Sequence, residues 1–257
     1  MGVQWGRMVT DLLQVERAAS DGFDFVQPAN DLVVNLSDEQ LRAEKARIRA
    51  DGAPFKVCAV PLPPDVRVSQ KGFNIYVWIE HLKNAAQRMA ELGCRKLVWS
   101  DGRARVLPVE GPIGEPTEQV RQFLYMLCAV AVDFDMTVLV EPLGPRRTNF
   151  LNTMKETGDF LAGVTADNLS SLISLRELDQ IGLPLSGIAE YRQFINHVQL
   201  DNPRSYDGER LCPRPDDGFE YRPFLQALKD LGYSADISLP EDADAGGLAY
   251  CRGLWES

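Results

Sequence analysis

Several features that mark other classes of protein are scarce in this sequence. It has two histidines, His81 and His197, and no apolar run of about 18 residues that could span a bilayer. No basic start followed by a continuous apolar stretch marks a secretory signal peptide. The five cysteines are an odd number without CxxC spacing, as expected of free thiols in a reducing compartment. We therefore expect a cytoplasmic protein that does not act at a membrane.

Basic clusters and nucleotide-binding turns are also scarce. The formal net charge is −10, the sequence pI is about 4.8, and the densest basic site is the pair Arg146-Arg147. Such a charge repels polyanions, so nucleic acid is not an expected partner. No GxGxxG turn follows the first expected strand, which argues against a nucleotide cofactor.

What remains is the composition of an ordinary globular protein. The chain has 257 residues, of which 45% are hydrophobic and 25% are charged. This length fits one (β/α)8 barrel, and no linker rich in Pro, Gly or Ser divides the chain. We therefore expect a single domain over residues 1–257.

Short apolar runs alternate with amphipathic stretches along the whole chain. Ser37 and Gln40 form a capping box that predicts the start of one helix. Strands that alternate with helices in this way form parallel sheets, either closed as a TIM barrel or open and doubly wound. The pattern predicts strands at 2–5, 23–27, 54–62, 95–100, 137–143, 168–178, 195–202 and 235–242, and helices at 8–20, 41–52, 77–92, 116–135, 152–164 and 221–233, with a short closing helix after 245.

Polar residues that end the apolar runs are the candidates for a site, because parallel barrels bind ligands at the carboxyl ends of their strands. Glu141 directly follows Val138-Leu139-Val140, and a buried carboxylate there needs a metal, an arginine or a shared proton. A structural salt bridge is the alternative. The other candidates are Gln27, Ser100, Asp101, Ser174, Arg176, Glu177, His197, Gln199, Asp201, Arg204 and Glu241.

The seventh strand carries the densest set of polar residues. His197, Gln199 and Asp201 alternate with Val198 and Leu200, so the three polar side chains share one face. We expect that face to point into the barrel, although a lone histidine in a strand is often a core residue. Arg204 and the pair Arg146-Arg147 are candidates for binding substrate oxygens, and Trp99 and Tyr206 for stacking on a sugar; exposed arginines and core aromatics are the alternatives.

Five segments together resemble a known family, the xylose-isomerase-like TIM barrels, which include sugar-phosphate isomerases and epimerases, hydroxypyruvate isomerase and AP endonucleases. They are GFDFVQ, LKNAAQRMAELGCRKLVW, VLVEPLGPRRTNFLNT, INHVQLDNPR and FLQALKDLGYSADISL. The resemblance covers nearly the whole chain and favours the closed (β/α)8 barrel over the open sheet. Two histidines are too few for the metal cluster of the AP endonucleases.

The resemblance also implies a divalent metal held by Glu, Asp, His and Glu at the ends of strands five to eight. Glu141 matches the first of these ligands. The Asp of a D-x-x-H pattern is Ser174 here, and the second His of H-x-H is Gln199. Pro240 stands where the last Glu is expected, with Glu241 one residue later. We therefore expect no metal, or a weak Mn, Mg or Zn site built from Glu141, Gln199 and Glu241.

Two functions follow as hypotheses. One is a sugar, sugar-phosphate or hydroxy-keto acid isomerase or epimerase that moves a proton next to a carbonyl, with Glu141, Glu241 and His197 as catalytic residues. Substrate would be bound by Arg204, Gln199, Gln27, Arg146 and Trp99. The alternative is a metal-free or non-catalytic barrel that binds a small molecule, as a pseudoenzyme or a partner subunit. The sequence leaves the oligomeric state open, including a homo-oligomer.

Overall fold

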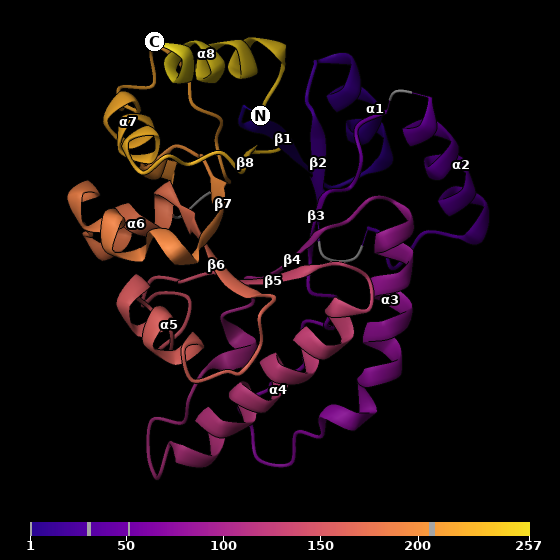
Figure 1. Cartoon of the computed structure of the whole chain (residues 1–257), viewed down its shortest axis with the longest axis vertical. Coiled ribbons are helices and arrows are strands. Elements are labelled where there is room, and N and C mark those ends of the chain that lie inside the picture. Colours follow the sequence, from indigo (N-terminus) through magenta and orange to yellow (C-terminus); the bar gives the residue numbers. More distant parts are fainter. Residues whose placement is uncertain (1, 30–31, 51, 206–208) are drawn as a thin grey trace.

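Eight parallel strands form the centre of the protein and helices surround them (Figure 1). The computed structural model describes residues 2–29, 32–50, 52–205 and 209–257. Neighbouring strands follow the order β2-β1-β8-β7-β6-β5-β4-β3, which is the sheet of a TIM barrel. The strands are β1 (Gln4–Val9), β2 (Phe25–Pro28), β3 (Val57–Ala59), β4 (Lys96–Trp99), β5 (Thr137–Val140), β6 (Leu169–Ser174), β7 (Ile195–Gln199) and β8 (Asp236–Leu239).

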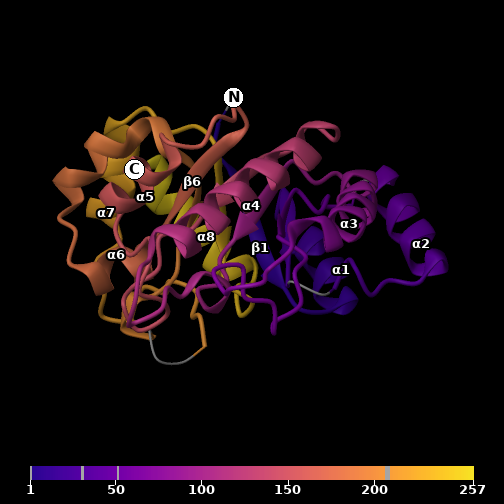
Figure 2. The ribbon, with the colours of Figure 1, turned by 90° about the horizontal axis from the view of Figure 1, so that it is seen from below.

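The barrel is nearly closed, with a seam between β2 and β3. The described residues form no continuous ladder across this seam, but Val26 N donates to the Pro54 carbonyl oxygen at 2.8 Å. The other neighbouring strands pair in parallel register. In Figure 2 the barrel is seen from the side, with the N-terminus at the top.

The helices follow the strands and cover them from outside. The Ser37 capping box forms as predicted: Gln40 N donates to Ser37 Oγ, and Ser37 N donates to Gln40 Oε1. The main helices are α1 (Leu12–Ser20), α2 (Asp38–Arg49), α3 (Ile79–Glu91), α4 (Gly114–Val132), α5 (Met154–Leu161), α6 (Leu175–Ile181), α7 (Arg222–Asp230) and α8 (Ala245–Glu256), and short 3-10 turns are η1 (Ile75–Val77), η2 (Arg103–Arg105), η3 (Leu185–Phe194) and η4 (Pro203–Ser205).

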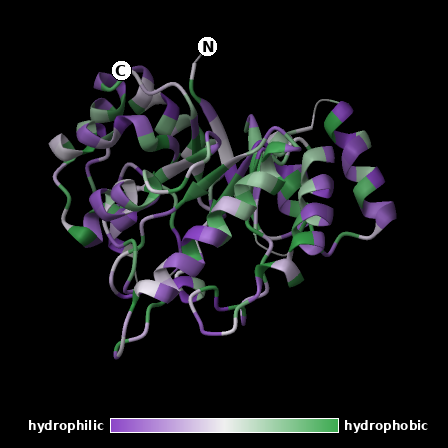
Figure 3. Ribbon diagram, turned by 60° about the horizontal axis from the view of Figure 1, so that its bottom comes forward, coloured by the Kyte–Doolittle hydropathy of each residue, from purple (hydrophilic) through white to green (hydrophobic). Residues whose placement is uncertain are grey.

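Alternate strand residues serve two separate apolar clusters. The larger cluster lies between the strands and the helices, and includes Trp99 of β4 and Phe123 of α4. Hydrophobic colour is accordingly concentrated on the strands and on one side of the helices (Figure 3). The smaller cluster fills the inside of the barrel and consists of Phe25, Val57, Val98, Leu139 and Leu172.

Inside the barrel, polar side chains lie on both sides of this inner cluster along the strand direction. Near the amino ends, Asp236 pairs with Lys56 and Lys96, each at 2.6 Å. The Phe25 ring reaches across the interior toward Gly6, where an added Cβ would lie 2.1 Å from a ring carbon. Gly6 thus provides the space for Phe25. The polar side chains near the carboxyl ends form the site described below.

Several predicted boundaries differ from the structure. Met8 belongs to β1, which runs to Val9, so the first strand is longer than 2–5 and the first helix begins at Leu12. The sixth strand ends at Ser174, and Arg176 and Glu177 lie in the first turn of α6. The closing helix, α8, is longer than predicted. Among the described residues, none of the helices combines the length and the apolar character needed to cross a membrane.

Candidate active site

The carboxyl ends of the strands surround a cavity of about 200 Å³, here called the mouth cavity. Five predicted candidates line it together: Gln27 of β2, Ser100 after β4, Glu141 after β5, Gln199 of β7 and Glu241 after β8. Two arginines line it as well: Arg147, from the pair Arg146-Arg147, and Arg210, which the sequence analysis did not select. Residues distant in sequence therefore converge here, because parallel strands end at the same side of the barrel.

Glu141 is fully buried, and its environment makes it chemically unusual. Neither carboxylate oxygen has a hydrogen-bond partner among the described residues. The nearest ionic partner is Arg210, whose Nη2 lies 3.6 Å from Glu141 Oε1. Burial raises the pKa of Glu141, Glu177 adds to this rise, and the nearby arginines oppose it. An incompletely paired carboxylate with a raised pKa is suited to accept and release a proton.

Arg105 forms a hydrogen bond with the backbone of Glu141. This buried side chain from η2 donates from Nη2 to the Glu141 carbonyl oxygen, and its guanidinium carbon lies 5.5 Å from the centre of the Trp99 ring. Burial lowers the pKa of Arg105 to about 10, so the group remains charged at neutral pH. Trp99 itself points outward and packs on Phe123. It does not face the mouth cavity, and its predicted stacking on substrate has no geometric support. The Trp99 ring lies against Arg105, and the Trp99 carbonyl oxygen accepts from Glu141 N at 3.2 Å.

Four neighbouring strands each present a buried polar atom without a hydrogen-bond partner in the described part of the chain. These atoms lie on β5 to β8, in the half of the barrel where the family metal ligands were expected. Buried polar groups in native proteins are normally hydrogen-bonded, so a ligand or ordered water is expected to satisfy them. The atoms are the carboxylate oxygens of Glu141, Ser174 Oγ, Gln199 Oε1 and Ser238 Oγ.

His197 lies inside the barrel, beside the apolar cluster, rather than in the lining of the mouth cavity. Its ring is fully buried and contacts Phe25 edge to face, with 6.4 Å between ring centres. Burial, with Lys96 adding to it, lowers the pKa of His197 to about 3, so the imidazole is neutral. Its Nε2 lies 3.2 Å from Gln27 Oε1 and can donate to it. This geometry supports positioning of Gln27 rather than direct contact with substrate.

A network of ion pairs adjoins Glu141. Asp201, fully buried, accepts from Arg210 Nη1 at 2.9 Å and lies 3.5 Å from Arg176 Nε. Glu177 accepts from Gly144 N at 2.8 Å, and Arg147 Nη1 lies 3.4 Å away. We call this set the arginine–carboxylate cluster; it consists of Glu141, Glu177, Asp201, Arg147, Arg176 and Arg210.

Arg204 does not belong to this cluster. Its side chain is exposed, and it contributes to neither cavity at the barrel mouth as far as the described residues define them. Arg210, from the same long loop after β7, takes the place that we predicted for Arg204. Tyr206, the other aromatic candidate, lies outside the described residues.

Glu241 is placed at the rim of the mouth cavity by its backbone. Arg7 Nη2 donates to the Glu241 carbonyl oxygen at 2.8 Å, and Arg7 Nε donates to the same oxygen at 3.2 Å. The side chain is exposed and still lines the cavity, and partial burial raises its pKa. Glu241 can therefore serve the site although Pro240 occupies the position expected for the glutamate.

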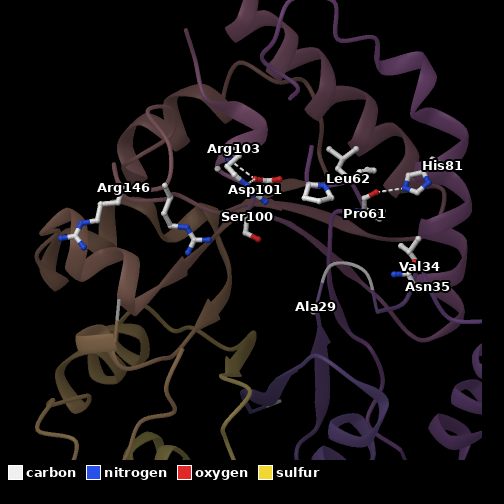
Figure 4. A pocket seen from close by; sticks show the side chains of 14 residues that line it. Ala29, Val34, Asn35, Pro61, Leu62, His81, Ser100, Asp101, Arg103 and Arg146 are labelled. Carbon is white, nitrogen blue, oxygen red and sulfur yellow. Dashed lines mark hydrogen bonds and ion pairs between the residues drawn. The ribbon is translucent and has the colours of Figure 1, made fainter. Parts of the chain in front are cut away.

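A larger cavity of about 1010 Å³ continues from the mouth cavity over the loops after β2 to β5 (Figure 4). Ala29, Ser100 and Arg147 line both cavities. Arg146 lines the larger one, but it is exposed and in Figure 4 its side chain extends away from Ser100 and Asp101. Of the predicted arginine pair, it is therefore Arg147 that adjoins the mouth.

The NFLNT segment connects the loops on this side of the barrel. Asn152 Nδ2 donates to the carbonyl oxygens of Leu143 and Thr148 at 2.7 and 2.9 Å. Asn149 exchanges two hydrogen bonds with the Leu107 backbone, at 2.8 and 2.9 Å. The segment thus fixes the loop that follows Glu141 and ties it to the loop after β4.

Comparison with known proteins now identifies the family. Residues 15–245 match the family model of the xylose isomerase-like TIM barrel. The chain belongs to this family. No curated protein sequence matches this xylose isomerase-like barrel.

Several solved structures with the same fold are those of sugar epimerases. A D-psicose 3-epimerase crystallised in the presence of D-fructose has a TM-score of 0.81 and 13% identity, over 99% of this chain and all of that one. An L-ribulose 3-epimerase has a TM-score of 0.80 and 16% identity, over 99% of this chain and 95% of that one. The 3-keto-D-glucoside 4-epimerase of E. coli has a TM-score of 0.77 and 17% identity, over 98% of this chain and 99% of that one. At such identities the likeness establishes the fold of the barrel.

The residues at the mouth do not fit the tight divalent-metal site of the family. Of the four ligand positions on β5 to β8, Glu141 keeps a carboxylate, whereas Ser174 and Gln199 are neutral oxygen donors that bind transition metals weakly. Glu141 also faces the Arg210 guanidinium. This donor set supports at most a weak metal site.

Proposed function

We propose that this barrel is a sugar or hydroxy-keto isomerase or epimerase that transfers a proton next to a carbonyl at the mouth cavity. The observation that carries the proposal is Glu141, a fully buried carboxylate with unpartnered oxygens and a raised pKa, lining a cavity at the carboxyl ends of the strands. A general base is most effective when its pKa approaches the working pH. The sugar epimerases of the same fold support the substrate class by analogy.

In the proposed reaction Glu141 accepts the proton from the carbon next to the carbonyl. The electron pair of the broken C–H bond forms a C=C bond, the carbonyl oxygen takes the negative charge, and an enediolate results. Glu241, at the rim of the same cavity, or Glu141 itself returns a proton to give the isomer or epimer. Gln199 and Gln27 offer amide groups to the hydroxyl groups of the substrate.

The test is proton exchange with solvent. Ketopentoses, ketohexoses and hydroxy-keto acids are incubated with the protein in D2O, with EDTA and with added Mn²⁺, and deuterium next to the carbonyl is followed by NMR. Glu141→Gln keeps the shape of the side chain and removes the base, so we expect exchange to slow by about 100-fold or more. The rate should also fall as the pH drops through the raised pKa of Glu141, because the base must be ionised.

Glu118→Gln on the exposed face of α4 is the matched control and should keep the wild-type rate. Wild-type exchange in Glu141→Gln would contradict the proposal. A barrel that only binds small molecules, favoured by the neutral Ser174 and Gln199, would bind a sugar without any exchange of deuterium.

A further inference from the structure

Arg210 is the described cation that lies within ion-pair distance of the Glu141 carboxylate. Its Nη1 lies 2.9 Å from Asp201 Oδ2 and its Nη2 lies 3.6 Å from Glu141 Oε1. Both carboxylates are fully buried, whereas the Arg210 side chain is 20% exposed and lines the mouth cavity. One guanidinium thus faces two buried carboxylates and the cavity at the same time.

The guanidinium also has donors left for a ligand. Its hydrogen bond within the described part of the chain goes from Nη1 to Asp201, and a guanidinium carries five N–H donors in a planar fork. The unpartnered oxygens of Glu141 and the Oε1 of Gln199 belong to the same cavity lining. A ligand in the cavity therefore meets a planar cationic donor on one side and a carboxylate acceptor beside it.

A divalent metal would have to share Glu141 with this guanidinium. A metal bound to a carboxylate lies about 2.0–2.2 Å from the oxygen, and Arg210 Nη2 is 3.6 Å from that atom. The arginine–carboxylate cluster already pairs three carboxylates with three guanidinium groups, so it has no surplus negative charge to hold a second cation. Metal and Arg210 therefore compete for one position.

We propose that Arg210 takes the place of the divalent metal in this barrel, and that its guanidinium binds two adjacent oxygens of the ligand and stabilises negative charge on them. The stabilisation of an enediolate rests on the proposed function; the binding of an oxyanion and the exclusion of metal do not. The proton goes from carbon to Glu141, and Arg210 donates hydrogen bonds without losing a proton. Burial lowers the pKa of Arg210, but Asp201, Glu141 and Glu177 outweigh that effect and raise it overall, so Arg210 stays charged.

The first experiment measures metal binding. Mn²⁺ is titrated into chelator-stripped protein and free Mn²⁺ is read by electron paramagnetic resonance. We expect no stoichiometric binding to the wild type. Ser174→Asp with Gln199→His restores the family donors, and this double variant should bind Mn²⁺ about 10- to 100-fold more tightly when Arg210→Met is added. Tight stoichiometric Mn²⁺ in the wild type, or equal affinity with and without Arg210, would overturn the proposal.

The second experiment measures oxyanion binding, with glycolate in EDTA as the probe and calorimetry as the readout. We expect the wild type to bind glycolate, Arg210→Lys to bind it more weakly because lysine lacks the planar fork, and Arg210→Met to lose the binding. Because Arg210→Met leaves Asp201 unpaired, Arg210→Met with Asp201→Asn repeats the measurement in a neutralised pair, and thermal melting reports the fold of each variant.

Absence of glycolate binding in the wild type, or binding that EDTA abolishes and Mn²⁺ restores, would overturn the role of Arg210. Both experiments measure equilibria and need no turnover. A failure to exchange deuterium with any sugar would therefore count against the proposed reaction alone, while the metal and glycolate titrations still decide the role of Arg210.

Discussion

Glu141 and Asp201 are equally buried and lie beside the same arginine, but their bonding differs. The Asp201 carboxylate accepts a hydrogen bond from Arg210 and lies near Arg176, whereas the Glu141 carboxylate accepts none from the described residues. Asp201→Asn should therefore lower the free energy of unfolding by about 3 kcal/mol, because buried guanidinium groups lose their partner. Glu141→Gln should leave it unchanged or raise it, because an amide is easier to desolvate than a carboxylate.

Urea unfolding of the two variants beside the wild type checks this contrast. A Glu141→Gln protein that loses as much stability as Asp201→Asn would show that Glu141 is mainly a structural partner of Arg210. That outcome would also remove the main support for its role as a base.

The burial of His197 is expected to make the stability of the folded protein sensitive to acid. Its folded pKa is about 3, against about 6.5 in an unfolded chain. Below pH 6.5 the unfolded chain takes up a proton that the folded protein excludes, so stability decreases as the pH falls. Between about pH 6 and pH 3 the loss should approach about 1.4 kcal/mol per pH unit. In His197→Gln this component of the pH dependence should be absent.

The measurement is the difference in unfolding free energy between wild type and His197→Gln at pH 7, 6, 5 and 4. Taking the difference removes the contributions of the carboxylates, which titrate in both proteins. His81→Gln, at the histidine whose Nε2 contacts the Pro61 carbonyl oxygen, is the control. Parallel pH profiles of wild type and His197→Gln would show that His197 becomes protonated within the folded protein.

At the level of single residues, the sequence predicted those site residues whose position follows from a strand. Glu141, Gln199 and Gln27 end apolar runs, and strand alternation directs their side chains inward. Arg210 could not be found in this way, because it lies in a loop whose path no periodicity describes. Trp99 was misplaced because a continuous apolar run such as residues 97–99 of β4 does not show which of its residues face inward.

At the level of elements, β1 and β2 are coupled by one glycine. An alanine at position 6 would place its Cβ 2.1 Å from the Phe25 ring, and overpacking of this kind typically costs about 1–3 kcal/mol. We expect Gly6→Ala to lose stability by that amount and to lose less when Phe25→Leu makes room. Thermal or urea unfolding of the wild type, the two single variants and the double variant gives the coupling free energy between Gly6 and Phe25.

Gly114→Ala is the matched control, because an added Cβ there meets no atom within 4 Å. If Gly6→Ala lowers the unfolding free energy by the same amount with and without the Phe25→Leu substitution, the close approach of Gly6 and the Phe25 ring does not contribute to the loss, and the prediction is contradicted.

The order and type of most elements could be predicted, since helix periodicity and capping are local. The Ser37 box formed at the predicted residues. The errors fell where local signals are ambiguous. Met8 fits both the apolar face of a helix and an alternating strand. It belongs to a strand because it pairs with Gln27 in the sheet. Leu175 directly continues the apolar run of β6, and nothing in the run itself marks the change to helix after Ser174.

At the level of the whole molecule, the seam between β2 and β3 should be the weakest part of the barrel. Its backbone pairing in the described residues is sparse, whereas the strands from β4 through β8 to β1 are joined by ladders. Amide hydrogens of β2 and β3 should therefore exchange earlier than those of β6 and β7. Hydrogen–deuterium exchange followed by mass spectrometry checks this order. Equal protection of all eight strands would contradict it.

The shared position of Arg210 has a consequence for how such a barrel can change over generations. Removing Arg210 first leaves Glu141 and Asp201 without their common cation, and introducing ligands at Ser174 or Gln199 first places them beside a charge that repels metal. Each single substitution toward a metal centre is thus neutral or harmful, and benefit comes when several are combined. Under the proposed role of Arg210, no series of single substitutions that are each beneficial leads from this barrel to a metal centre. A barrel in which Arg210 has replaced the metal is therefore not expected to regain metal binding stepwise.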